Sequence, residues 1–209
     1  MKKIMLALIM LVSLTKVATA QKGSILLYGS VGFSSASDSF NAKSNAYIIN
    51  PGIGLQLNDH WTAGLNLAFG GTSQATTSNG IPNGDGHNTT SFFNIGPFLR
   101  YAYSINNTFS IYGQAEINYL SGNTSPYLTD EISYTGFGAN LFPALGINIK
   151  NGYAINLSFG GISYQTKSYK GEPISNNPYL SGSSSQFAVT LGQGATFGIS
   201  KNFGGTKSK

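Results

Sequence analysis

The chain has 209 residues and no cysteine, and charged residues make up 9% of it against a usual share of about 25%. The net charge is +5, but Lys2, Lys3 and Lys16 lie in an N-terminal leader and Lys207 and Lys209 at the C-terminal end, so the remainder is balanced. This composition excludes a disulfide-stabilised fold. It also excludes a basic nucleic-acid-binding surface, so no nucleic acid is expected as a partner.

Residues 1–20 have the pattern of a secretory signal. Two lysines precede an apolar run over 4–14, and Ala18-Thr19-Ala20 provides a small-residue cleavage site. A membrane anchor helix would need about 20 apolar residues, and Lys16 interrupts the run too early. We therefore predict a signal peptide that is cleaved before Gln21.

After the leader, apolar residues alternate with small or polar ones in eight segments, which is the pattern of β-strands with one apolar face. The predicted strands span 24–33, 46–57, 61–70, 92–103, 108–119, 136–149, 153–163 and 186–203. The residues predicted to face outward are Ile25, Leu27, Val31, Phe33, Tyr47, Ile49, Ile53, Leu55, Leu57, Trp61, Ala63, Leu65, Leu67, Phe69, Phe93, Ile95, Leu99, Tyr101, Tyr103, Phe109, Ile111, Ile117, Tyr119, Phe137, Leu141, Leu145, Ile147, Ile149, Tyr153, Ile155, Leu157, Phe159, Phe187, Val189, Leu191, Phe197, Ile199 and Phe203.

Three stretches repeat one hairpin design, beginning at 50, 96 and 142. Each has a proline as its second residue, at Pro51, Pro97 and Pro143, and the two intervals between these prolines are equal. Each then makes a short turn and restarts on an aromatic residue: Trp61, Phe109 or Tyr153. Proline cannot donate to a strand ladder. We therefore expect a bulge or a missing hydrogen bond at each proline, toward the external half of the second, fourth and sixth strands.

The connections alternate in length. Short turns are predicted at 58–60, 104–107 and 150–152, and long loops at 34–45, 71–90, 120–135 and 164–185. Asn151-Gly152 suits the positive φ angles of a tight hairpin. In outer-membrane barrels the short turns are periplasmic and the long loops external. Tyr127, Tyr169 and Tyr179 stand in these loops, where contact surfaces are built.

These features predict an all-β protein with a single closed eight-stranded antiparallel up-and-down transmembrane β-barrel over 21–203, followed by a short basic periplasmic tail over 204–209. After the leader no segment is long and apolar enough for a spanning helix, and a spanning protein without helices must close a barrel. A soluble sandwich is the alternative, but it needs no aromatic residues at both strand ends. The predicted membrane-interface aromatics are Trp61, Phe69, Phe93, Tyr101, Phe109, Tyr119 and Tyr153.

An eight-stranded barrel has an interior that side chains fill. The large or charged inward residues are Tyr28, Arg100, Tyr112 and Glu116, and with Gln114 the last three form a candidate polar network in the lumen. A turn near 105–106 would place the charges of Arg100 and Glu116 about 13 Å apart. A buried charge without a partner is costly, so an interior ionic network is expected. A gate in a narrow conduit is the alternative.

No catalytic, metal or cofactor site is predicted, and no enzymatic activity. His60 lies in a periplasmic turn, and His87, two residues after Asp85, lies in a polar loop. Asp85 with His87, or Asp130 with Glu131, lacks the spacing of a metal site. Glycine pairs such as Gly52-Ile53-Gly54 and Gly192-Gln193-Gly194 lie inside strands with no following helix, so they do not form phosphate loops. Their expected role is to make room for large neighbours.

The hairpins resemble the transmembrane domain of OmpA-like proteins and the wider porin family of small eight-stranded outer-membrane barrels. The stretches 97–103 and Pro143-Ala144-Leu145-Gly146 carry the resemblance best. The last strand, ending at Phe203, is similar to the terminal-aromatic signal that the barrel-assembly machinery recognises, although Gly204 to Lys209 follow it. No peptidoglycan-binding domain follows the barrel, so the cell-wall tethering of full-length relatives does not carry over. The resemblance implies a monomer in the outer-membrane lipid of a Gram-negative-type bacterium.

Two classes of function remain open. The first is a structural or surface-interaction role, in envelope integrity or in adhesion through the external loops. The second is a narrow passive channel for small or apolar solutes. The tyrosines of the loops favour the first class slightly.

Overall fold

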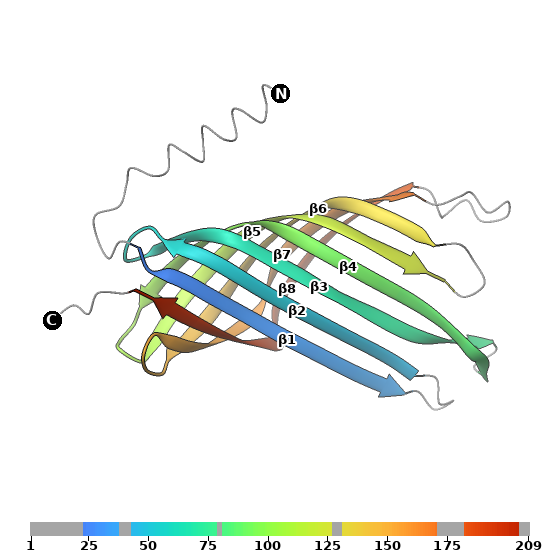
Figure 1. Cartoon of the computed structure of the whole chain (residues 1–209), viewed down its shortest axis with the longest axis horizontal. Helices are drawn as coiled ribbons and strands as arrows, with labels where there is room; N and C mark the ends of the chain where they lie inside the picture. Colours follow the sequence, from blue (N-terminus) through green and yellow to red (C-terminus); the bar gives the residue numbers. More distant parts are fainter. Residues whose placement is uncertain (1–22, 38–42, 79–80, 127–130, 171–181, 205–209) are drawn as a thin grey trace, which may run out of the picture.

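The computed structural model describes residues 23–37, 43–78, 81–126, 131–170 and 182–204. Their strands form one closed antiparallel barrel in which each strand pairs with its neighbour in sequence and β8 pairs with β1 (Figure 1). The strands are β1 (Ile25–Ser37), β2 (Lys43–Gln56), β3 (Trp61–Ser78), β4 (Ile81–Ser104), β5 (Phe109–Ser125), β6 (Ile132–Asn148), β7 (Tyr153–Lys170) and β8 (Gly182–Phe203). The predicted fold class is confirmed. The proposed signal over 1–20 lies outside the described residues, as does most of the tail.

Successive side chains alternate between the outer surface and the lumen, as the period of a strand requires. Large apolar residues such as Leu27, Ile53, Leu65 and Leu99 are exposed on the outside, where the strands meet lipid. The predicted outward residues follow this alternation, apart from Leu191, whose side chain lies outside the described part. Among the described residues, no helix is long and apolar enough to cross a membrane.

The strands reach much farther toward the long-loop end than predicted. Within the predicted loops at 34–45, 71–90, 120–135 and 164–185, nearly all the residues that the structure describes continue the ladders. The strands β3 and β4 extend furthest, to Ser78 and from Ile81. The prediction was wrong because the apolar alternation stops where both faces of a strand meet water. Backbone hydrogen bonds do not need that alternation, so Ser-, Thr- and Asn-rich segments still pair.

The short turns are built by asparagine. Asn58 Oδ1 accepts hydrogen bonds from the backbone nitrogens of His60 and Trp61, both at 2.9 Å. Asn106 Oδ1 does the same for Thr108 and Phe109, at 2.8 and 2.7 Å. In the third turn Asn151 and Gly152 adopt φ angles of 55° and 79°, the left-handed pair of a tight hairpin turn.

Each proline interrupts the ladder with the following strand. Pro51 and the residue before it form no rung with β3, and Pro97 and its predecessor form none with β5 in the described ladders. At Pro143 the ladder between β6 and β7 also shifts its register. The interruption of the ladder that was expected at each proline is therefore observed. Its expected place in the external half was wrong, because the strands extend so far toward the long loops that the prolines lie nearer the short turns.

Of the eight ladders between neighbouring strands, the one between β1 and β8 is the shortest. It is paired from Ile25 with Phe203 to Gly29 with Ile199, although β1 continues to Ser37 and pairs with β2 along its whole length. The ladder between β7 and β8 jumps from Phe159 opposite Ala195 to Gly160 opposite Leu191. The residues between 191 and 195 thus form a bulge in β8, and a bulge bends the strand that carries it.

Candidate functional site in the barrel lumen

Arg100 is the centre of a compact group of side chains in the short-turn half of the lumen. Its guanidinium carbon lies 4.7 Å from the ring centre of Tyr28 and 4.2 Å from that of Tyr112, so the cation is held between two aromatic faces. Phe98 packs edge-on against Tyr28, with ring centres 5.3 Å apart. Such desolvated cation–π contacts contribute about 2 kcal/mol each.

Gln114 connects the two lumen charges. Arg100 Nε donates a 2.7 Å hydrogen bond to Gln114 Oε1, and Gln114 Nε2 donates to Glu116 Oε1 at 2.6 Å and to the Tyr28 hydroxyl at 3.1 Å. The Gln114 side chain is fully buried. Four residues named as a candidate network, Arg100, Tyr112, Gln114 and Glu116, thus lie together. The Arg100 and Glu116 side chains are each hydrogen-bonded to the side-chain amide of Gln114, which links them.

A turn near 105–106 would have placed Arg100 opposite about residue 111, and this expected register was wrong by three residues. Arg100 lies opposite Gln114, and Glu116 lies opposite Phe98, because the turn closes around Asn106 and the first rung joins Ser104 to Ser110. Arg100 and Glu116 therefore lie two rungs apart, close enough for one glutamine to reach both.

Inward glycines make room for these large side chains, as expected. A Cβ on Gly52 would overlap the ring of Tyr28, and one on Gly54 or Gly64 would lie 2.8 or 2.7 Å from the ring of Phe98. Gly192 and Gly194 differ from these glycines because they lie in the bulge of β8. Together with Gln193 they have no ladder partner on β7.

This group fills the lumen at its level. Leu26, Thr62, Phe98, Arg100 and Ala144 are all buried although their side chains point into the barrel. They come from four different strands, so the filling extends around the interior.

A cavity of about 500 Å³ lies next to this group. It is lined by an asparagine from each of six successive strands: Asn50, Asn66, Asn94, Asn118, Asn140 and Asn156. Asn66 Nδ2 and Asn118 Nδ2 donate to Glu116 Oε2 at 3.2 and 3.3 Å. This ring of amides was not singled out from the sequence. The signal that could have found it is one asparagine at an inward position of each of these strands.

The predicted interface aromatics form two rows on the outer face. Near the short turns, Trp61 lies opposite Tyr101 with ring centres 4.9 Å apart. Eight residues along β3, Phe69 lies opposite Phe93, a climb of roughly 20 Å at the usual tilt. The other members, Phe109, Tyr119 and Tyr153, are also exposed on the outside.

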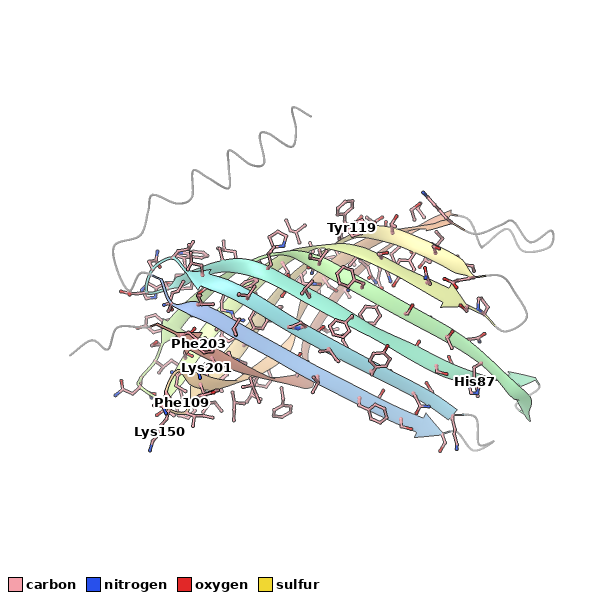
Figure 2. The ribbon with its side chains drawn as sticks, in the orientation of Figure 1. His87, Phe109, Tyr119, Lys150, Lys201 and Phe203 are labelled. Atoms are coloured by element: carbon pink, nitrogen blue, oxygen red, sulfur yellow. The ribbon has the colours of Figure 1, made fainter. Side chains whose placement is uncertain are left out.

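Phe203 lies at the short-turn end of the barrel with Phe109, Lys150 and Lys201 (Figure 2). Lys201 Nζ lies over the ring of Phe203, 4.6 Å from its centre, and donates a 3.0 Å hydrogen bond to the hydroxyl of Tyr153. The candidate assembly signal is thus part of the interfacial row that closes β8 against β7 and β1.

The two histidines differ in their surroundings. His60 Nδ1 lies 3.0 Å from the carbonyl oxygen of Ala102, and its ring stacks on Tyr101. His87 is in β4 opposite Ala75, not in a loop as predicted. The side chain of Asp85, and Asp130 as a whole, lie outside the described residues. In the part of the chain that the structure describes, no group of three acidic, histidine or cysteine side chains could hold a metal ion.

Comparison with known proteins identifies the family. The model of the outer membrane protein beta-barrel domain matches residues 4–192. A comparison with curated protein sequences gives no match. Among solved structures, the chain is similar to Ail, the attachment invasion locus protein of Yersinia pestis, in complex with the heparin analogue sucrose octasulfate, at a TM-score of 0.40 and 13% identity over 88% of this chain and 100% of that chain.

A major outer membrane protein from Thermus thermophilus is similar at a TM-score of 0.42 and 11% identity, over 87% of this chain and 99% of that chain. At these TM-scores the structural likenesses carry no argument about activity. The family match covers most of the sequence and agrees with the closed barrel, its apolar outer face and its aromatic rows. The chain therefore belongs to the family of outer membrane protein β-barrel domains, whose place is the bacterial outer membrane.

Proposed function

We propose that this protein has a non-catalytic role in the outer membrane, supporting the envelope and presenting its strand ends for contact at the cell surface. The filled lumen around Arg100 and Gln114 supports this proposal best, because a channel needs a continuous aqueous path. An eight-stranded barrel has little interior space to spare, and here large side chains occupy it.

The polar strand ends supply the surface for contact. Beyond the rung of Phe69 and Phe93, β3 and β4 continue as a paired ribbon to Ser78 and Ile81, which is about 20 Å of further rise at the usual tilt. Of the three tyrosines expected in external loops, Tyr169 lies in β7 and packs on Tyr134, with ring centres 5.7 Å apart. Tyr127 and Tyr179 lie outside the described residues. Exposed segments on a rigid scaffold are where contact sites are found.

The route to this location is part of the proposal. Residues 1–20 act as a cleaved signal, and the barrel-assembly machinery recognises β8 through its terminal aromatic, Phe203. The barrel then resides as a monomer in the lipid of a Gram-negative-type outer membrane. The balanced charge of the mature chain supports the absence of a nucleic-acid partner.

In planar bilayers, we expect the purified protein to show no stable conductance. As a matched control, Tyr28→Ala combined with Tyr112→Ala should raise conductance, because these two rings enclose Arg100 and close the lumen. A large, stable conductance in the unmodified protein would refute the filled-lumen proposal and favour a narrow channel for small solutes.

An epitope tag should report the orientation. A tag inserted between β3 and β4, at 79–80, or between β7 and β8, in 171–181, is expected to bind antibody on intact cells. A tag between Asn151 and Gly152 should be accessible only after the outer membrane is permeabilised, because short turns face the periplasm. The reverse labelling pattern would show that the barrel is inserted the other way.

A further inference from the structure

Two lysines, Lys150 and Lys201, lie at the short-turn end of the barrel (Figure 2). Lys150 is exposed in the turn between β6 and β7. Lys201 lies near the end of β8, opposite Tyr153 on β7. The backbone nitrogen of Tyr153 donates a 3.0 Å hydrogen bond to the Lys150 carbonyl oxygen. Lys150, Tyr153 and Lys201 thus adjoin one another along the turn and across the ladder, and we refer to them as the basic patch.

Aromatic rings hold Lys201 at the level of the membrane interface. Its Nζ atom lies 4.3 Å from the ring centre of Tyr153 and 4.6 Å from that of Phe203, and it donates a 3.0 Å hydrogen bond to the Tyr153 hydroxyl. An ammonium group has three donors, so two are left after this bond in the part of the chain that the structure describes. The Tyr153 hydroxyl keeps its own proton to donate. Because interfacial aromatics lie at the level of lipid head groups, these donors are placed where phosphates are found.

The charge at the short-turn end is divided between two sides of the ring. The chain has seven acidic residues, and Asp59 is the only one within the turns at 58–60, 104–107 and 150–152. Asp59 lies between β2 and β3, and β3 is four strands away from β7 in a ring of eight. Glu116 lies in the lumen, bonded to Gln114. The basic patch is therefore far from the carboxylate of its own end, and an anionic partner matches it.

An apolar groove of about 460 Å³ lies on the outer face of the same wall. Its floor is Gly113 of β5, which lies in one rung between Tyr101 of β4 and Pro143 of β6. A Cβ added to Gly113 would meet nothing within 4 Å. Leu145 and Phe159 also line the groove. The larger outward side chains project past Gly113, so they leave a gap in the face that meets hydrocarbon.

The strand β7 connects the basic patch to the groove. Tyr153 begins this strand, and Phe159 is six residues farther along it on the same outer face. At the usual rise and tilt, six residues climb about 15 Å, which is half of a hydrocarbon core of about 30 Å. The acyl chains of one leaflet span that half. A lipid whose head group lies at the basic patch therefore has chains long enough to reach the groove.

We propose that the barrel binds an anionic phospholipid of the leaflet next to the short turns, with its phosphate at the basic patch and one acyl chain in the groove. The ammonium groups of Lys150 and Lys201 and the hydroxyl of Tyr153 donate charge-assisted hydrogen bonds to the phosphate oxygens. A zwitterionic head group brings its own ammonium group, which the two lysines repel. A second copy related by a two-fold axis would bring the same lysines against the patch. This inference does not depend on the proposed surface role.

Quenching by brominated lipids tests the head-group preference. The reporter is the tryptophan introduced by Phe109→Trp in a Trp61→Phe background, because Phe109 lies at the same end as Lys150 (Figure 2). We expect brominated phosphatidylglycerol in phosphatidylcholine vesicles to bind beside this reporter at least about fivefold more tightly than brominated phosphatidylcholine, the effect of one lysine near a membrane surface. Equal binding of the two lipids would overturn the proposal. The unmodified protein, whose tryptophan lies beside Asp59, is the control and should show no such preference.

Two double variants in the same reporter background separate the basic patch from overall charge. Lys150→Gln with Lys201→Gln should abolish the preference. Lys43→Gln with Lys170→Gln removes two exposed lysines at the long-loop end and should leave the preference unchanged. A preference that survives the first pair, or is lost equally with the second, would overturn the assignment to the patch. Glycerol 3-phosphate should not compete, because it has no acyl chain, and competition by it would show a site for free phosphate esters instead of lipid.

Gly113→Leu tests the groove. The space in front of Gly113 accepts the leucine side chain, which then excludes the acyl chain. Native mass spectrometry from detergent that contains phosphatidylglycerol should show one retained lipid on the unmodified protein. We expect at least about fivefold lower occupancy for Gly113→Leu, the effect of losing the burial of a few methylene groups. Ala63→Leu enlarges an outward residue of β3 and should retain the lipid. Full retention by Gly113→Leu would overturn the place of the acyl chain.

Discussion

Replacing Gln114 by leucine is expected to lower the free energy of unfolding by about 3 to 5 kcal/mol, the usual cost of breaking a buried charged network. Gln114 is fully buried and bonds to Arg100, Glu116 and Tyr28. Leucine fills a similar volume but leaves the Arg100 guanidinium and the Glu116 carboxylate without these bonds. Urea unfolding in lipid vesicles, followed by the fluorescence of the single tryptophan, Trp61, would measure the effect.

Ser110→Ala is the matched control on the same strand. Ser110 Oγ makes one long hydrogen bond, 3.4 Å, to the Gly146 carbonyl oxygen, so we expect a loss of at most about 1 kcal/mol. The network also predicts coupling between Arg100→Ala and Glu116→Ala. Removing one charge leaves the other unbalanced in the lumen, so the second change should restore part of the stability. Strictly additive losses would show that Gln114 does not connect the two residues.

Leu65→Arg is expected to lower the stability of the barrel by about 2 to 4 kcal/mol, the usual cost of a cation near the middle of the bilayer. Leu65 lies on the outer face of β3, 53% exposed, between the row of Trp61 and Tyr101 and the row of Phe69 and Phe93. The same urea titration, in vesicles and not in detergent, measures the loss.

Ser73→Arg provides the comparison on the same strand and face, beyond the row of Phe69 and Phe93. There the side chain reaches the interface or water, so the expected loss is about 0 to 1 kcal/mol. Asn66→Arg, whose side chain would point into the lumen, should be limited by space and by the hydrogen bond to Glu116. Equal tolerance of arginine at 65 and 73 would mean that the apolar band is not at the level assigned.

The alternation along the chain predicted the barrel because side-chain direction in a strand has a period of two, and each spanning strand carries that period in its own sequence. The inward or outward direction of Tyr28, Leu65 and Gln114 was therefore readable locally. The turns at Asn58 and Asn151 were also readable, since their residues favour the required conformations. The full strand lengths were not, because the polar ends of β3 and β4 pair through backbone groups that carry no side-chain signal.

The contacts inside the lumen were decided only by the tertiary structure. Arg100 bonds to Gln114 because the turn at Asn106 fixes which residue of β5 lies opposite Arg100. A different turn geometry would have placed another residue opposite it. Tyr28 reaches Arg100 from a distant strand, and Gly52 leaves the space for it. The ladder between β1 and β8 ends at Gly29 and Ile199, and β8 carries a bulge just beyond that rung. By itself the sequence determined the faces of the strands, which follow from local periodicity. Closure brought distant residues together, because register and bending are set by the whole ring of strands.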